Sequence, residues 1–358
     1  MTFGRVLRNV FSCVWLATSA AVAQPPTMRA RTPTCAACRI VLVKDLALDT
    51  VNAAATVSRQ PIHASRSPQG RIAVVPGSSI EPVLLFDAGG KFLTPIGRKG
   101  SGPNEYVRTV AAHWLDADRL NIYDLASARV TTVNAAGRLV GTAPFHANSA
   151  LLRPLDRGAH LVVNAFGGGR FAVYDSGALD GRTFGTIPEE RPTRVQLSNV
   201  RRGQFWSVLS RSYRLDAWSV AGRHLATIER AAPWLSRNMP YSDGTFGLAP
   251  TAYSQDLRVD SLGRIWVLTT VASAGWRNGL GSPVKVNGRD RYPDRNMEKL
   301  FDTIIDVFDG TSFQLLTSHR VPGFFMVFLS DEHVLRQREG DDGSQVLEVW
   351  RVRMESEL

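Results

Sequence analysis

Two cysteines lie close together near the start of the chain, Cys35 and Cys38, in the pattern C-A-A-C. A c-type haem site requires a histidine directly after the second cysteine, and Arg39 occupies that position. A zinc site requires further Cys or His ligands at short spacing, and none is nearby. A thioredoxin-like pair precedes a helix, whereas an apolar β-run follows here. A local disulfide is therefore the favoured interpretation, with a redox or metal role as the alternative.

Other residues that could perform acid–base or metal chemistry are scattered. The chain contains no G-x-S-x-G elbow, no H-E-x-x-H motif and no P-loop. His113 is the histidine best placed to act as a base or ligand, because it lies on an expected innermost strand, although packing is the commoner role. Acids at strand ends offer oxygen ligands suited to Ca²⁺, but turns favour Asp for structural reasons as well. These acids are Asp116, Asp118, Asp260 and Asp331.

Three long segments combine aromatic and arginine side chains, the residue types that dominate binding hot spots. They span 98–106, 230–253 and 271–302, and connections of this length are uncommon unless they are functional or disordered. The alternative is that the aromatic residues pack these segments onto the core. The candidate binding residues are Arg98, Trp234, Tyr241, Trp276, Arg277, Arg291 and Tyr292.

The first residues have the features of an export signal. Arg5 and Arg8 precede an apolar run over 11–21, and Ala21-Val22-Ala23 is a small-residue cleavage pattern. The run is too short to span a bilayer. We therefore predict a signal peptide over residues 1–23, a secreted or periplasmic location, and no transmembrane segment in the mature chain.

The formal net charge is +10, which raises the question of nucleic-acid binding. The basic residues are dispersed, with no block of five like charges, and export separates the protein from nucleic acid. A basic, soluble surface is the simpler interpretation.

The elements that must position these residues are short β-runs in a repeated pattern. A β-run leads to a second one, then a turn, a Gly in most copies, and a further β-run, as in 83–93, 129–140, 213–226 and 305–316. About four strands recur in each of six units, with almost no helical periodicity. Repeated four-stranded antiparallel sheets predict an all-β, six-bladed β-propeller.

Counting strands also predicts how the ring closes. The sixth unit ends after Val352 without an outer strand, whereas the run Arg39 to Leu46 at the other end has no partner. Pairing the two removes a bare sheet edge. We therefore predict that the N-terminal strand closes the last blade of a single domain over residues 39–354, preceded by a flexible segment, 24–38, that carries the cysteines.

Residues 96–140 carry a family resemblance. Gly97, Arg98, Gly100, Gly102, Pro103, Glu105 and Tyr106 match the segment G-R-x-G-x-G-P-G-E-[FY]. This resembles the NHL repeat, and in particular the secreted bacterial six-bladed propellers that carry this segment. The departure is Asn104 where Gly is usual, and Asn tolerates a left-handed backbone better than most residues. The resemblance implies the fold, while function must be argued from a site.

These observations favour an exported, monomeric, non-enzymatic propeller that binds a protein, peptide or glycan. In a propeller, the connections between blades and those joining second and third strands emerge on one face, so the three long loops share that face. The alternative, suggested by related calcium-dependent propeller lactonases, is a metal-dependent hydrolase or a lyase that uses the central channel. No cofactor is predicted for the favoured function, and Ca²⁺ belongs to the alternative.

Overall fold

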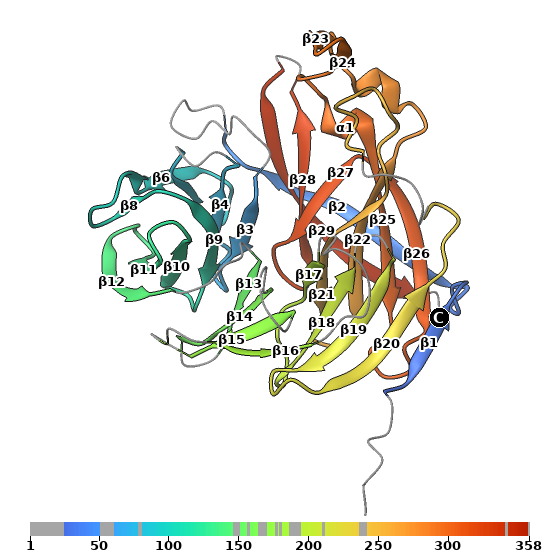
Figure 1. The fold of residues 1–358 in the computed structure, drawn as a ribbon, viewed down its shortest axis with the longest axis horizontal. Coiled ribbons are helices and arrows are strands. Elements are labelled where there is room, and N and C mark those ends of the chain that lie inside the picture. The colour runs from blue at the N-terminus through green and yellow to red at the C-terminus, as the bar shows by residue number, and fades with distance from the viewer. Residues whose placement is uncertain are drawn as a thin grey trace, which may run out of the picture.

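Short β-runs assemble into six antiparallel sheets arranged around a common axis in the computed structural model of the chain (Figure 1). The structure describes residues 25–50, 61–77, 81–145, 151–155, 158–163, 170–175, 178, 181–185, 195–209, 212–235, 242–340 and 343–356. Each sheet is one blade of a six-bladed β-propeller, as predicted. Within the described residues, no helix is both long and apolar enough to cross a membrane.

The blades follow one another in chain order. Blade 1 contains β3 (His63–Arg66), β4 (Ile72–Val75), β5 (Val83–Phe86) and β6 (Phe92–Ile96). Blade 2 contains β9 (Thr109–Trp114), β10 (Arg119–Asp124), β11 (Arg129–Asn134) and β12 (Leu139–Pro144). Blade 3 contains β13 (Leu152–Pro154), β14 (His160–Val163), β15 (Phe171–Tyr174) and β16 (Arg182–Phe184). Blade 4 contains β17 (Val195–Leu197), β18 (Gln204–Leu209), β19 (Arg214–Ser219) and β20 (His224–Arg230).

The last two blades carry the longer strands. Blade 5 contains β21 (Tyr253–Val259), β22 (Ile265–Ala272), β25 (Phe301–Phe308) and β26 (Leu315–Pro322). Blade 6 contains β27 (Phe324–Phe328), β28 (His333–Glu339), β29 (Gln345–Ser356) and β2 (Cys38–Ala47). A two-residue pair, β7 (Arg98–Lys99) and β8 (Glu105–Tyr106), joins blade 1 to blade 2.

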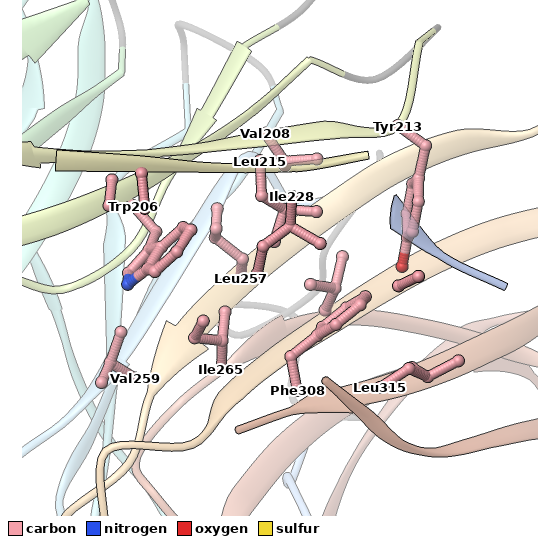
Figure 2. Close-up of a cluster of buried hydrophobic side chains, with 14 residues drawn as sticks. Trp206, Val208, Tyr213, Leu215, Ile228, Leu257, Val259, Ile265, Phe308 and Leu315 are labelled. Atoms are coloured by element: carbon pink, nitrogen blue, oxygen red, sulfur yellow. The ribbon is translucent and has the colours of Figure 1, made fainter. Parts of the chain in front are cut away.

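Middle strands are apolar on both faces because each sheet packs between two neighbours. All residues of β4 and β5 are buried, whereas burial alternates along the outer strand β6. Figure 2 shows one such inter-blade core, with Val208, Leu215 and Ile228 of blade 4 facing Leu257 and Phe308 of blade 5. Burying an aliphatic side chain of this kind stabilises the fold by about 1.5–3 kcal/mol.

The repeated sequence pattern corresponds to one recurring turn between the third and fourth strands of a blade. In blade 1, Asp87 accepts hydrogen bonds from the backbone N–H groups of Gly89 and Lys91, and Gly90 has a φ of 86°. Blade 2 repeats this with Asn134. The positive φ explains the glycine, because residues with a Cβ rarely adopt it.

The ring is closed by pairing of the two ends of the domain. β2 lies antiparallel to β29 over a register that runs from Cys38 opposite Ser356 to Ala47 opposite Glu348. The sheet order is β2-β29-β28-β27, so β2 is the outer strand of the last blade. This agrees with the closure predicted from the sequence.

The segment before β2, which the sequence predicted to be flexible over residues 24–38, contains a short strand. Thr27–Ala30 forms β1, which pairs parallel with β20 as a fifth strand on blade 4. The chain then crosses to blade 5, where the Thr34 N–H donates to the Leu315 carbonyl (2.8 Å). Residues 27–47 therefore tie the outer edges of blades 4, 5 and 6 together, a path that Figure 1 shows in blue.

Cys35 and Cys38 form a disulfide at the point where this segment passes from blade 5 to β2. The Cys35 N–H donates to the Leu316 carbonyl of blade 5 (3.2 Å), and the Thr317 hydroxyl donates to the Cys38 carbonyl (3.2 Å). The bond thus fixes the bend that directs the chain into the closing strand, as the favoured interpretation of the C-A-A-C pattern proposed.

Deleting all residues through Leu46 is expected to destabilise the fold strongly. The deletion exposes the edge of β29 and removes the buried side chain of Ile40, worth about 1.5–3 kcal/mol, from a domain whose total stability is of order 5–15 kcal/mol. A chain lacking only residues through Arg31 keeps β2 and is expected to lose much less. Urea denaturation compares the two, and equal unfolding midpoints would rule out closure by β2.

Candidate functional sites

The largest departure from a minimal propeller is an insertion between β22 and β25 in blade 5. It contains a 3-10 helix, η2 (Trp276–Gly279), a hairpin of β23 (Val284–Val286) and β24 (Arg289–Arg291), and the short helix α1 (Met297–Leu300). Asn296 caps α1 by accepting a hydrogen bond from the Lys299 N–H (3.0 Å). Figure 1 shows β23 and β24 beyond the ends of the blade strands and α1 beside the upper part of blade 6, on what we call the loop face.

The insertion is attached to the propeller by its aromatic residue. Trp276 is only 9% exposed and packs with Tyr253, Leu300 and Phe324. Its neighbour Arg277 is exposed, with the guanidinium carbon 4.5 Å from the Trp276 ring centroid. Of these two predicted binding residues, the structure therefore gives Trp276 a packing role and presents Arg277 to solvent.

A second long loop lies against the insertion. The Tyr292 N–H donates to the Thr245 carbonyl (2.8 Å), and Arg295 forms an ion pair with Asp243 (2.9 Å). Tyr292 also contacts the backbone at Gly247, where a Cβ would lie 3.0 Å from the ring. The sequence prediction that these two loops share one face is thus consistent with direct contacts between them.

A polar groove of about 940 Å³ separates the insertion from the β28–β29 hairpin of blade 6. Its lining includes Asn278, Arg291, Arg295, Lys299, Gln337 and Gln345. An ion pair between Arg336 of β28 and Glu298 of α1 holds the two walls together. Of the predicted binding residues, Arg291 is the one that lines this groove.

The remaining loop residues do not join this groove. Arg98 is highly exposed but pairs with Glu105 (2.7 Å), which also accepts the Gly102 N–H. These two contacts lower the pKa of Glu105, the Gly102 N–H being the larger cause. Asn104 has a φ of 56°, so it adopts the left-handed conformation expected where the similar propeller segment has Gly. The glycine-rich segment therefore forms a self-contained turn.

Trp234 belongs to a different part of the loop face. Its ring packs against that of Tyr213 (5.4 Å between centroids) at the edge of the core between blades 4 and 5. Tyr241 lies outside the described residues. A binding role for Trp234 and Tyr241 stays a prediction.

The second candidate site lies in the central channel, where the innermost strands of the blades meet. Two successive cavities of about 140 and 190 Å³ share His63, Arg153, Asp256 and Val327 in their linings. The first lies toward the loop face and we call it the upper cavity; the second is the lower cavity. All six blades contribute to the lower cavity, through His63, His113, Arg153, Asn199, Asp256 and Phe328.

An ion pair separates the two cavities. Arg153 Nη2 lies 3.2 Å from Asp256 Oδ1 and also donates to the Leu197 carbonyl (2.6 Å). Asp256 Oδ2 accepts the Phe328 N–H (2.8 Å). Burial raises the pKa of Asp256, an effect that the nearby Arg153 opposes. Sequence reasoning missed this pair, because the blade register alone brings together residues so far apart in the chain.

Histidine rings surround the Arg153 side of the channel. His63 and His113 contact edge to face (4.3 Å between centroids), and Tyr123 lies between His113 and His160. Burial, and to a smaller extent the charge of Arg153, lowers the pKa of His63 to about 3. Burial likewise lowers the pKa of His113 and of His160. The three rings are therefore uncharged near neutral pH.

The acids considered as metal ligands serve the turns and the channel rim. Asp116 and Asp260 each accept backbone N–H groups of their own turns, and Asp118 is exposed beside Asp116. Asp331 forms ion pairs with Arg201 and Arg258. Among the residues that the structure describes, no group of three or more His, Cys, Asp or Glu side chains is arranged to hold a metal ion.

The fold and these two sites define a six-bladed β-propeller with an elaborated loop face and a polar channel. Residues 46–155 match the DUF5128 family, described as a 6-bladed beta-propeller. A search of the curated proteins found no similar sequence.

Solved structures extend the similarity to most of the chain. A member of the DUF4221 family from Bacteroides vulgatus has a TM-score of 0.61 at 10% identity, over 89% of this chain and 99% of that one. A protein of Bacteroides fragilis described as a candidate exported protein has a TM-score of 0.55 at 12% identity, over 92% and 100%. At such identities the similarity shows the fold alone.

The buried histidines are expected to make stability fall with acid. An unfolded histidine titrates near pH 6.5, so the folded state binds fewer protons than the unfolded state between that value and about 3 for His63. Stability is thus full above pH 6.5 and is lost as pH falls, by about 2 kcal/mol at pH 5 for His63 alone.

Urea denaturation of the His63→Gln variant at pH 7.5 and pH 5 measures this contribution. The loss between the two pH values is expected to shrink by about 2 kcal/mol relative to the unsubstituted protein. His319→Gln, at an exposed position on β26, is the control and is expected to leave the loss unchanged. An equal loss in all three proteins would contradict the assignment of His63 as a buried neutral ring.

Proposed function

We propose that this chain is an exported, non-enzymatic binding protein that recognises a protein, peptide or glycan through its loop face. The groove between the blade-5 insertion and the β28–β29 hairpin is the specific site. Its volume of about 940 Å³ falls in the range of roughly 300–1,000 Å³ common for ligand pockets.

Unsatisfied polar groups on the groove lining support this proposal. Gln337 Oε1 and Arg295 Nε are buried and have no hydrogen-bond partner among the described residues. One is an acceptor and the other a donor, and leaving either unpaired costs about 1–3 kcal/mol. Both residues line the groove, so a ligand that presents a donor and an acceptor, as peptide amides and sugar hydroxyl groups do, pairs with these atoms once the two side chains turn toward it.

The rim of the groove adds charge and adaptable contacts. Arg291 and Lys299 are exposed beside the acidic residues Asp294 and Glu339. Arginine is enriched at binding hot spots because its planar guanidinium group offers five donors. The mixture of charges favours a polar, extended ligand over an apolar one.

Export is part of the proposal. Its support is the signal-like sequence over residues 1–23, which lies outside the described residues, together with the Cys35–Cys38 disulfide. Disulfides persist in oxidising compartments and are rare in the cytosol. We propose a monomer in the secreted or periplasmic space.

Replacing Arg291 with Ala is expected to weaken ligand capture at least about tenfold, because a charge-assisted hydrogen bond contributes about 1.5–3 kcal/mol. The assay applies the mature protein to glycan and peptide arrays and measures the affinity of each hit by calorimetry. Arg289→Ala is the matched control, since this residue lies on the same strand β24 but does not line the groove. Equal affinities for both variants, or no hit on either array, would overturn the groove as the binding site.

A further inference from the structure

The lower cavity of the channel has features that the proposed loop-face function does not use. Half of its lining residues are apolar, among them Leu257, Val327, Phe328 and Leu329. Charged residues, Arg153, Asp256 and Arg258, line it as well. A cavity of about 190 Å³ exceeds the roughly 150 Å³ that suffices for benzene. The cavity therefore has room for a small organic molecule with an apolar body.

The charged residues at this end of the channel carry an excess of positive charge. Arg153 pairs with Asp256, while Arg258 and Arg201 share Asp331. Three guanidinium groups thus face two carboxylates in a partly buried cluster. Uncompensated charge is costly away from water, so one bound anion balances the cluster.

The two arginines that line the cavity retain hydrogen-bonding capacity. Arg153 donates through Nη1 and Nη2 to the carbonyls of Leu152 and Leu197 and to Asp256, which uses three of its five N–H groups. Arg258 donates through Nε to Asp331 and makes no other side-chain hydrogen bond among the described residues. Free guanidinium donors of this kind match the geometry of a carboxylate.

A neutral acceptor lines the same cavity. The His113 ring is hydrogen-bonded to the backbone of Leu152, whereas its Nε2 atom is buried without a partner in the described part of the chain. Since the ring is uncharged, one of its nitrogens is a donor and the other an acceptor. Because Nε2 has no partner, the backbone contact is assigned to the other ring nitrogen, and Nε2 is left to accept a hydrogen bond from a hydroxyl group.

Solvent reaches this end of the channel by a graded path. Side-chain exposure rises from 7% at Asp256 and 15% at Arg153 to 24% at Arg258 and 38% at Arg201. The charged cluster therefore leads from the surface to the cavity, and its net positive charge attracts an anion along the way.

We propose that the lower cavity binds a small monocarboxylate with an apolar body and a hydroxyl group. The carboxylate accepts hydrogen bonds from Arg153 and Arg258, and the hydroxyl group donates to His113 Nε2. The apolar body lies against Leu257 and Phe328. This site lies in the channel, so it is separate from the groove on the loop face.

Calorimetric titration with three probes of similar size tests the proposal: 4-hydroxybenzoate, benzoate and benzyl alcohol. We expect 4-hydroxybenzoate to bind most tightly, benzoate about tenfold more weakly, and benzyl alcohol not measurably. Arg258→Gln is expected to weaken both acids about tenfold or more, and His113→Phe to remove the advantage of the hydroxyl group. Thermal melting of each variant verifies that the fold is retained.

Arg201→Gln is the matched control, because it removes the same charge from the same cluster without touching the cavity. It is expected to weaken the binding of both acids much less than Arg258→Gln does, whereas the groove variant Arg291→Ala is expected to leave that binding unchanged. The proposal is overturned if no acid binds at millimolar concentration, if benzyl alcohol binds as well as benzoate, or if Arg201→Gln weakens binding as much as Arg258→Gln. Failure of the groove variants to affect array binding bears on the loop face alone.

Discussion

The structure depends on one constraint: a ring of sheets is complete only when its last blade has an outer strand. The N-terminal segment meets this constraint, since β2 pairs with β29 through nine opposed residue pairs and covers the edge of β29. Ile40 and Val352 then complete the core that blade 6 shares with blade 5. The segment before β2 contributes to closure as well. Its strand β1 and the Cys35–Cys38 bend attach the outer edges of blades 4 and 5 to the closing strand.

Closure also explains why two sites can exist at once. A closed ring brings one innermost strand from each blade to the axis, and this is how Arg153 of blade 3 meets Asp256 of blade 5 in a buried pair. The groove on the loop face is built differently, from an insertion within blade 5. This insertion contacts blade 6 through the Arg336–Glu298 ion pair. The channel is therefore set by the whole ring, whereas the groove can vary in one blade without disturbing the others.

Much of the fold was predictable because its signals are local. A few neighbouring residues are enough to indicate the role of the turn residues Asp87 and Asn134 and of the left-handed Asn104. The same holds for the β-run that begins at Arg39, which has no partner near it in the sequence. The channel was not predictable, because the partnership of Arg153 with Asp256 arises only from the register between blades. The sequence could not decide whether the loop aromatics bind a ligand or pack, for a related reason. Trp276 was predicted to bind, but it is buried because Tyr253 and Phe324 approach it from other strands. The pairing of Thr27–Ala30 had no periodic signal in so short and polar a segment.

The account is tested most directly by hydrogen exchange along the closing strand. If β2 completes the ring, those of its amide protons that are hydrogen-bonded to β29 can exchange only when the last blade opens, so their opening free energy is expected to match that of the β28 amides and of global unfolding. If the β2 amides exchange with a much lower opening free energy while β28 and β29 stay protected, the ring is stable without its closing strand, which would contradict the account.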